Sequence, residues 1–68
     1  MLTLTVNGKT MELATGSATL ADVVTRMGLE GKRIAIERNG EIVPRSRYAT
    51  TPVASGDRLE IVGAVGGG

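Results

Sequence analysis

Apolar residues occupy every second position in four short segments of the chain, a spacing typical of β-strands with one buried face. The alternating residues are Leu2, Leu4 and Val6, then Met11 and Leu13, then Ile34 and Ile36, and finally Leu59 and Ile61. The apolar pair Ile42-Val43 predicts a further strand, which ends at Pro44 because proline has no N–H group to donate. The pattern therefore predicts a sheet of about five strands.

Two Asn-Gly pairs separate neighbouring strands. Asn7-Gly8 follows the first alternating segment, and Asn39-Gly40 follows the third. Both residue types tolerate the positive φ angles of tight hairpin turns. We therefore expect two β-hairpins, in which the asparagines serve as turn residues and nothing more.

The segment between the hairpins has the spacing of an amphipathic helix, with apolar residues at i, i+3, i+4 and i+7. This apolar stripe consists of Leu20, Val23, Val24 and Met27. Thr19 precedes the stripe as a candidate N-cap, and Asp22 stands where a capping box has its acid. Gly28 can adopt the left-handed conformation that ends a helix, which would pack Leu29 against Val24.

A hairpin on each side of one helix predicts an α+β fold of the β-grasp, or ubiquitin-like, type. Its helix packs on one face of a mixed sheet, whose first and last strands lie parallel in the middle. Residues 45–55 have no clear period and are expected to form a crossing loop with one helical turn, anchored by Tyr48. We expect a β-grasp domain over residues 1–63 and a flexible glycine tail over residues 64–68. The predicted core comprises Leu2, Leu4, Val6, Leu13, Leu20, Val23, Val24, Met27, Ile34, Ile36, Ile42, Leu59 and Ile61.

Composition excludes several classes of function. The 68 residues include no cysteine and no histidine, and Tyr48 is the only aromatic residue. The chain thus lacks the usual catalytic base, the usual zinc ligands and the rings that stack on nucleic-acid bases. We expect a protein that is not an enzyme, with no catalytic residue, no metal site and no cofactor bound by the chain itself.

Charge and hydropathy indicate where the protein acts. A net charge of +1 argues against a protein that binds polyanions. No apolar run approaches the roughly 20 residues that span a membrane, and the N-terminal residues lack the basic and apolar regions of a signal peptide. We therefore expect a cytoplasmic protein that binds neither nucleic acid nor membranes.

The sequence ends in three glycines, which do not favour a packed fold because glycine has the highest backbone entropy cost. One interpretation is a frayed end or the remnant of a linker. The other is a carboxyl group on an arm, with residues 64–68 reaching roughly 17 Å when extended. Without Cβ atoms, such an arm could enter a channel too narrow for other residues.

Four segments of the chain together resemble one known family. They are residues 39–46 (Asn-Gly-Glu-Ile-Val-Pro-Arg-Ser), the turn Gly56-Asp57, residues 58–62 (Arg-Leu-Glu-Ile-Val) and residues 64–68 (Ala-Val-Gly-Gly-Gly). The family is ThiS, the ubiquitin-like sulfur carriers of thiamine biosynthesis, and the resemblance covers the whole chain. The diglycine ending is less specific, since the small subunit of molybdopterin synthase shares it. Tyr48 stands where many members have tryptophan or histidine, a mild departure that leaves the role intact.

The resemblance implies a reaction at the carboxyl group of Gly68. An adenylating enzyme of the ubiquitin-activating type uses ATP and Mg²⁺ to form an acyl-adenylate, because a free carboxylate is a poor electrophile. A sulfur donor, a cysteine desulfurase or a related persulfide protein, then displaces AMP and leaves a thiocarboxylate. Thiazole synthase accepts this sulfur. Gly66 and Gly67 give access to the reacting end, and the chain is a co-substrate of its partner enzymes.

Three further residues are candidate partner contacts. Alternation places Val62 and Val65 on or near the outward face, where they could enter an apolar groove of a partner or pack as an ordinary sheet edge. Arg45 could contact a partner or tether the crossing loop. It belongs to a basic group that is either a solvated face or a docking patch for acidic surfaces. This group consists of Lys32, Arg33, Arg38, Arg45 and Arg47.

Two other functions stay open at this stage. The chain could carry sulfur for molybdopterin or for another sulfur-containing metabolite, which would involve different partner enzymes. It could also be a ubiquitin-like binding module, with dispensable terminal glycines and a strongly basic face. The net charge of +1 and the free end at Gly68 favour a carrier.

Overall fold

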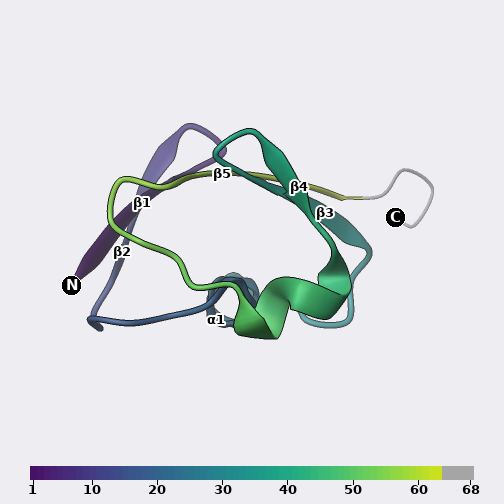
Figure 1. Cartoon of the computed structure of the whole chain (residues 1–68), viewed down its shortest axis with the longest axis horizontal. Coiled ribbons are helices and arrows are strands. Elements are labelled where there is room, and N and C mark those ends of the chain that lie inside the picture. Colours follow the sequence, from purple (N-terminus) through teal and green to yellow (C-terminus); the bar gives the residue numbers. More distant parts are fainter. Residues whose placement is uncertain (64–68) are drawn as a thin grey trace.

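The computed structural model describes residues 1–63, so the predicted tail over residues 64–68 lies outside the described residues. Along the chain the elements are β1 (Leu2–Val6), β2 (Lys9–Leu13), α1 (Leu20–Arg26), β3 (Ile34–Arg38), β4 (Glu41–Val43), the 3₁₀ helix η1 (Arg45–Thr50) and β5 (Arg58–Gly63). The sheet has the order β2-β1-β5-β3-β4, and β1 runs parallel to β5. Both α1 and η1 lie on one side of this sheet (Figure 1). The predicted β-grasp arrangement is therefore confirmed, with the first and last strands adjacent at its centre.

Helix α1 has the caps that its sequence predicts. The Asp22 backbone N–H donates to Thr19 Oγ1 at 3.3 Å, and the Thr19 N–H donates to the Asp22 carboxylate at 2.8 Å. At the other end Gly28 has a φ of +71°, and the Leu29 N–H donates to the Val24 carbonyl at 3.0 Å. A capping box and a Schellman motif thus pair backbone groups that the helix itself leaves open.

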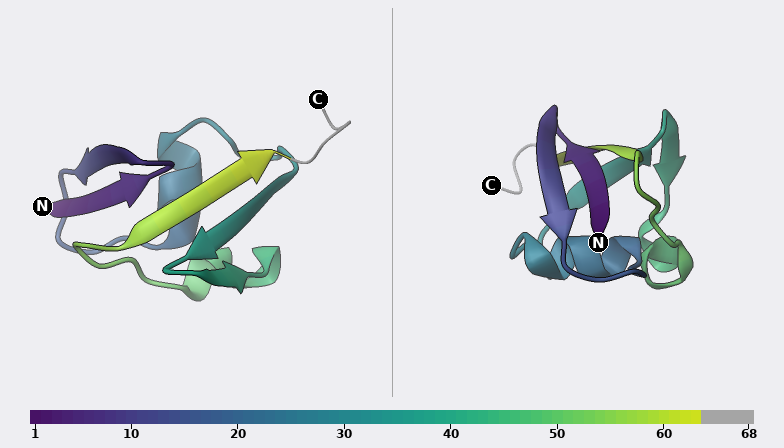
Figure 2. Two further views of the ribbon diagram at one scale, coloured as in Figure 1. Left: turned by 90° about the horizontal axis from the view of Figure 1, so that it is seen from above. Right: turned by 90° about the vertical axis from the view of Figure 1, so that its left-hand side faces the viewer.

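The core lies between the sheet and the layer of α1 and η1, and the right-hand view of Figure 2 shows these two layers one above the other. Most predicted core residues are buried, whereas Met27 and Ile34 are half-buried and pack against the core. Segments without a clear period complete the core with Ala18, Tyr48 and Val53. The predicted role of Tyr48 as a loop anchor is confirmed by its burial.

The prediction that Ile42 belongs to the core is wrong, because its side chain is 65% exposed. Cross-strand register explains the difference. Ile36 of β3 points into the core and pairs with Val43 of β4, whereas Glu37 pairs with Ile42. Since successive residues of a strand point to opposite faces, only Val43 of the apolar pair can face inward.

Asn7 extends the contact between β1 and β5 beyond the point where the backbones stop pairing. The parallel ladder reaches Val6 and Leu59. The Asn7 side chain then donates from Nδ2 to the Ile61 carbonyl at 2.9 Å, and Oδ1 accepts the Ile61 N–H at 2.7 Å. Asn7 also has the predicted turn conformation, with a φ of +51°. The expectation that it serves only as a turn residue is wrong. Its side-chain amide bonds to the N–H and the carbonyl of Ile61, as the backbone of a further β1 residue would.

No helix within residues 1–63 combines the length and the apolar composition that crossing a membrane requires.

The Asn7 amide predicts a measurable contribution to stability. Asn7→Gly keeps the positive φ accessible and removes the amide, so the Ile61 peptide groups lose two partners. We expect the free energy of unfolding in urea to fall by about 1–3 kcal/mol. Asn7→Ala should lose about 1–2 kcal/mol more, because alanine disfavours the left-handed conformation. A glycine variant as stable as the original chain would show that the side-chain bonds contribute nothing.

Candidate functional site

The candidate site is the end of β5, from which the chain continues into residues 64–68. Val62 pairs with Ala35 of β3, and Gly63 pairs with Ile34. The Val62 side chain is 59% exposed, so the predicted outward orientation is confirmed. Its contact with a partner stays a prediction. The other predicted tail residues, Val65, Gly66, Gly67 and Gly68, lie outside the described residues.

Gly63 is the last residue of β5, and nothing around it requires a glycine. A Cβ atom built on it would meet only the Arg33 carbonyl oxygen, at 4.0 Å, and its φ is not in the left-handed region. The domain therefore does not need this glycine for its own packing.

The predicted basic group is divided by the fold. The Arg38 guanidinium lies 2.8 Å from a carboxylate oxygen of Asp57, before the start of β5. Arg45 is exposed at the start of η1, and the bonds described for residues 1–63 include none from its guanidinium. Instead, the Thr51 hydroxyl donates to the Arg47 carbonyl at 2.7 Å and ties the crossing segment internally. A partner contact of Arg45 stays a prediction.

Asp57, which the sequence offered only as a turn residue, is buried just before β5 and collects several hydrogen bonds. Its carboxylate accepts the Nε–H of Arg38 at 2.8 Å, an N–H of the Asn39 amide at 3.0 Å and the backbone N–H of Ala54 at 2.8 Å. Asn39 Oδ1 in turn accepts the Arg58 N–H at 2.8 Å. The two hairpin asparagines thus act alike, since both bond to the β5 backbone.

The environment of Asp57 shifts its acidity. Burial alone would raise the pKa of the carboxyl group. The hydrogen bonds from Asn39, Ala54 and Arg38, together with the positive charge of Arg38, outweigh that effect and lower the pKa below its ordinary value of 3.8. The ionised form is therefore the one that this site stabilises.

These contacts define what the site can do chemically. The network around Asp57 fixes the start of β5, and Asn7 fixes its middle at Ile61. Within residues 1–63 no group of three or more acidic side chains is arranged to hold a metal ion. The described part of the chain presents the end of a well-fixed strand to its surroundings.

The lowered pKa of Asp57 predicts a loss of stability in acid. Because the pKa is lower in the folded chain than in the unfolded chain, the stabilisation is complete above the unfolded pKa and is lost as pH falls through the folded pKa. Urea unfolding measured from about pH 7 down to about pH 2 should show this loss mainly below about pH 4. Asp57→Asn should be less stable by about 1–3 kcal/mol at neutral pH, and its free energy of unfolding should depend less on pH. If the stability of the original chain and that of the variant fell by the same amount as the pH was lowered, this role of Asp57 would be contradicted.

The surroundings of Gly63 predict that the domain tolerates a side chain there. Gly63→Ala should leave the free energy of unfolding unchanged or raise it by about 0.5–1 kcal/mol, because glycine weakens strands. The melting temperature should accordingly stay the same or rise slightly. Thermal unfolding followed by circular dichroism measures this directly. A marked loss of stability would show a backbone constraint at residue 63. Loss of partner binding with normal stability would show that a partner needs the bare backbone.

Comparison with known proteins places the chain. The ThiS family model matches residues 4–68. The sulfur carrier protein ThiS of Bacillus subtilis is 37% identical over 65 residues, which cover 96% of this chain and 98% of that protein. A thiazole synthase of Paramagnetospirillum magneticum is 42% identical over 65 residues, again 96% of this chain, but the chain spans only 20% of that protein's length.

Solved structures agree with these matches. The crystal structure of the thiamine biosynthesis protein ThiS from Geobacter metallireducens has a TM-score of 0.84 and 29% sequence identity, over 98% of this chain and 100% of that chain. A solution structure of a thiamine biosynthesis protein from the same organism gives a TM-score of 0.80, over 98% of this chain and 88% of that chain. By the family match over almost its whole length, this chain belongs to the ThiS family.

Proposed function

We propose that the chain is a sulfur carrier protein of thiamine biosynthesis, acting in the cytoplasm as a co-substrate of other enzymes and not as an enzyme itself. The observation that carries this proposal is the ThiS family match over residues 4–68. The near full-length similarity to the Bacillus subtilis sulfur carrier supports it. The absence of cysteine and histidine from the sequence also fits a protein whose partners supply the catalytic groups.

The reacting group in this proposal is the carboxyl group of Gly68, with Gly66 and Gly67 giving access to it. An adenylating enzyme of the ubiquitin-activating type joins the carboxylate to AMP, using ATP and Mg²⁺. This step supplies the leaving group that a free carboxylate lacks. The outer sulfur of a persulfide donor, a cysteine desulfurase or a related protein, then displaces AMP and forms an acyl disulfide. A thiol attacks the donor's sulfur in this S–S bond, which forms a new disulfide on the donor and releases the thiocarboxylate.

Thiazole synthase is the proposed acceptor of the sulfur. The Paramagnetospirillum magneticum protein of that name contains a segment similar to this chain within a polypeptide of about five times its length, since the chain spans 20% of it. A carrier and an acceptor that share one polypeptide would always be near each other, which favours transfer between them. The fold suits this role, because β5 leads directly from the centre of the sheet to residues 64–68.

Intact mass spectrometry tests the proposal. The chain is incubated with ATP, Mg²⁺, the adenylating enzyme of the same organism, a persulfide donor and a thiol reductant. We expect a mass gain equal to the replacement of one oxygen by sulfur, which disappears when ATP is omitted or Gly68 is deleted. Adding thiazole synthase and its small-molecule substrates should then restore the original mass.

Each outcome separates the alternatives. A mass gain that thiazole synthase cannot reverse would point to a sulfur carrier of another pathway. A chain that stays folded and gains no mass would contradict the carrier function and favour a ubiquitin-like binding module.

A further inference from the structure

The two hairpin turns contain the only carboxamide side chains of the sequence. These are Asn7 and Asn39, each followed directly by a glycine, and the chain has no glutamine. All four residues are exposed, and a Cβ atom built on Gly8 or Gly40 would meet nothing within 4 Å. The turns lie far from α1, on either side of β5 (Figure 1). Water therefore reaches both Asn-Gly peptide bonds.

An asparagine that precedes glycine can lose its side-chain nitrogen without an enzyme. The backbone nitrogen of the glycine attacks Cγ of the asparagine, and the new N–Cγ bond closes a succinimide ring. The Cγ–Nδ2 bond breaks, and Nδ2 leaves as ammonia with the proton of the glycine N–H. Water then opens the ring at either carbonyl, which gives aspartate or isoaspartate. Glycine favours this deamidation because it has no side chain in the way and a freely rotating backbone.

The folded chain holds Asn7 in a position from which the ring cannot close. Its Nδ2 donates to the Ile61 carbonyl at 2.9 Å, and its Oδ1 accepts the Ile61 N–H at 2.7 Å. Its backbone N–H donates to the Leu59 carbonyl at 2.9 Å. Attack by Gly8 requires the side chain to fold back over the next peptide bond, so the two bonds to Ile61 must break first.

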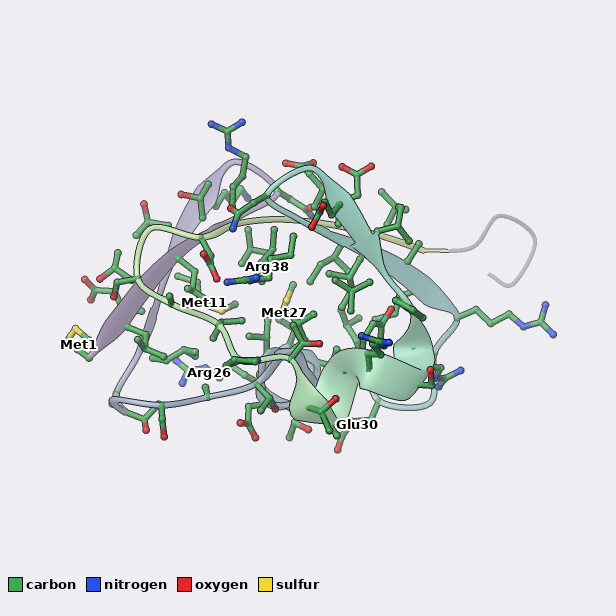
Figure 3. The ribbon with its side chains drawn as sticks, in the orientation of Figure 1. Met1, Met11, Arg26, Met27, Glu30 and Arg38 are labelled. Atoms are coloured by element: carbon green, nitrogen blue, oxygen red, sulfur yellow. The ribbon has the colours of Figure 1, made fainter. Side chains whose placement is uncertain are left out.

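Asn39 is held in the same way from the other side of β5. Its Oδ1 accepts the Arg58 N–H at 2.8 Å, and its backbone N–H donates to the Arg58 carbonyl at 2.8 Å. Its Nδ2 donates at 3.0 Å to one carboxylate oxygen of Asp57. Arg38, labelled in Figure 3, lies 2.8 Å from the other oxygen and keeps this acceptor in place. Release of Asn39 therefore also requires the start of β5 to move away.

We propose that Asn7 and Asn39 are deamidation sites which the fold protects, and that both become reactive together when β5 leaves the sheet. A reaction that needs local opening proceeds in proportion to the population of the open form. Because β5 is bonded to both turns, a single opening releases both asparagines. The reaction needs only water, so it does not depend on the carrier function.

The products weaken the contacts that protected the sites. At residue 39 a carboxylate takes the place of the amide that donated to Asp57, so two like charges meet at a buried group. At residue 7 an oxygen takes the place of the donor to the Ile61 carbonyl. Isoaspartate also adds a methylene group to the backbone of the turn. The first deamidation therefore loosens β5 and speeds the second.

Peptide mass spectrometry of the stored chain tests this inference. The chain is kept in mildly alkaline buffer, either folded or unfolded in guanidinium chloride, and is then digested into peptides that contain one asparagine each. Deamidation appears as the mass change of an amide that becomes a carboxyl group. We expect both asparagines to react more slowly in the folded chain, by about tenfold or more. Equal rates in the folded and the unfolded chain would overturn the protection by the fold.

Asn39→Asp and Asn39→Gly test the coupling between the two turns. Both remove the amide that bonds to Asp57, and glycine keeps the positive φ accessible without adding a charge. The glycine variant therefore serves if the aspartate variant does not fold. We expect Asn7 to deamidate faster in each folded variant than in the original folded chain, by about fivefold or more. In guanidinium chloride its rate should be the same in all three chains.

Glu41→Ala is the matched control. Glu41 is exposed in the same hairpin, and the bonds described for residues 1–63 include none from its carboxylate. Its replacement should leave the rate at Asn7 within about twofold of the original. If the folded Asn39 variants deamidate at Asn7 no faster than the Glu41 variant, the coupling through β5 is overturned.

Discussion

The fold depends on the insertion of its last strand between its first and third strands. β5 pairs with β1 on one side and with β3 on the other, so the sheet has no centre without it. The Asn7 amide bonds join residues 54 positions apart in the sequence. Such distant contacts carry a loop-closure entropy cost, and the sheet is complete only when β5 is in place. The strand that leads to the proposed reacting end is thus also the one that holds the sheet together.

Local signals in the sequence were enough to predict most of the fold. The caps of α1 and the two turns depend on residues a few positions apart, so they can be recognised without knowing the rest of the chain. Ile42 was misplaced because two adjacent apolar residues leave the register of β4 open, and only its pairing with β3 decides which one faces inward. The role of Asp57 could not be predicted either, since its partners Arg38 and Asn39 lie 19 and 18 positions away.

The structure also gives a physical reason for the residues on which the family resemblance rests. In the segment 39–46, Asn39 bonds to both Asp57 and the backbone of Arg58, Gly40 has a φ of +89°, and Pro44 directly precedes η1. This segment therefore positions the start of β5. The candidate site has two parts. The contacts that support it lie within residues 1–63, whereas the proposed reaction takes place at Gly68. The glycines of the sequence indicated the end at which the proposed reaction takes place, and the structure shows what holds the strand before it.

A domain of 68 residues has little stability to lose, since folded domains are stable by only about 5–15 kcal/mol and so short a chain buries a modest core. The side-chain hydrogen bonds of Asn7, Asn39 and Asp57 therefore matter more here than they would in a larger protein. All three residues act on the same strand: Asn7 bonds to Ile61, Asn39 bonds to Arg58, and Asp57 directly precedes β5. The strand that leads to residues 64–68 is thus held by its turns as well as by its neighbours in the sheet.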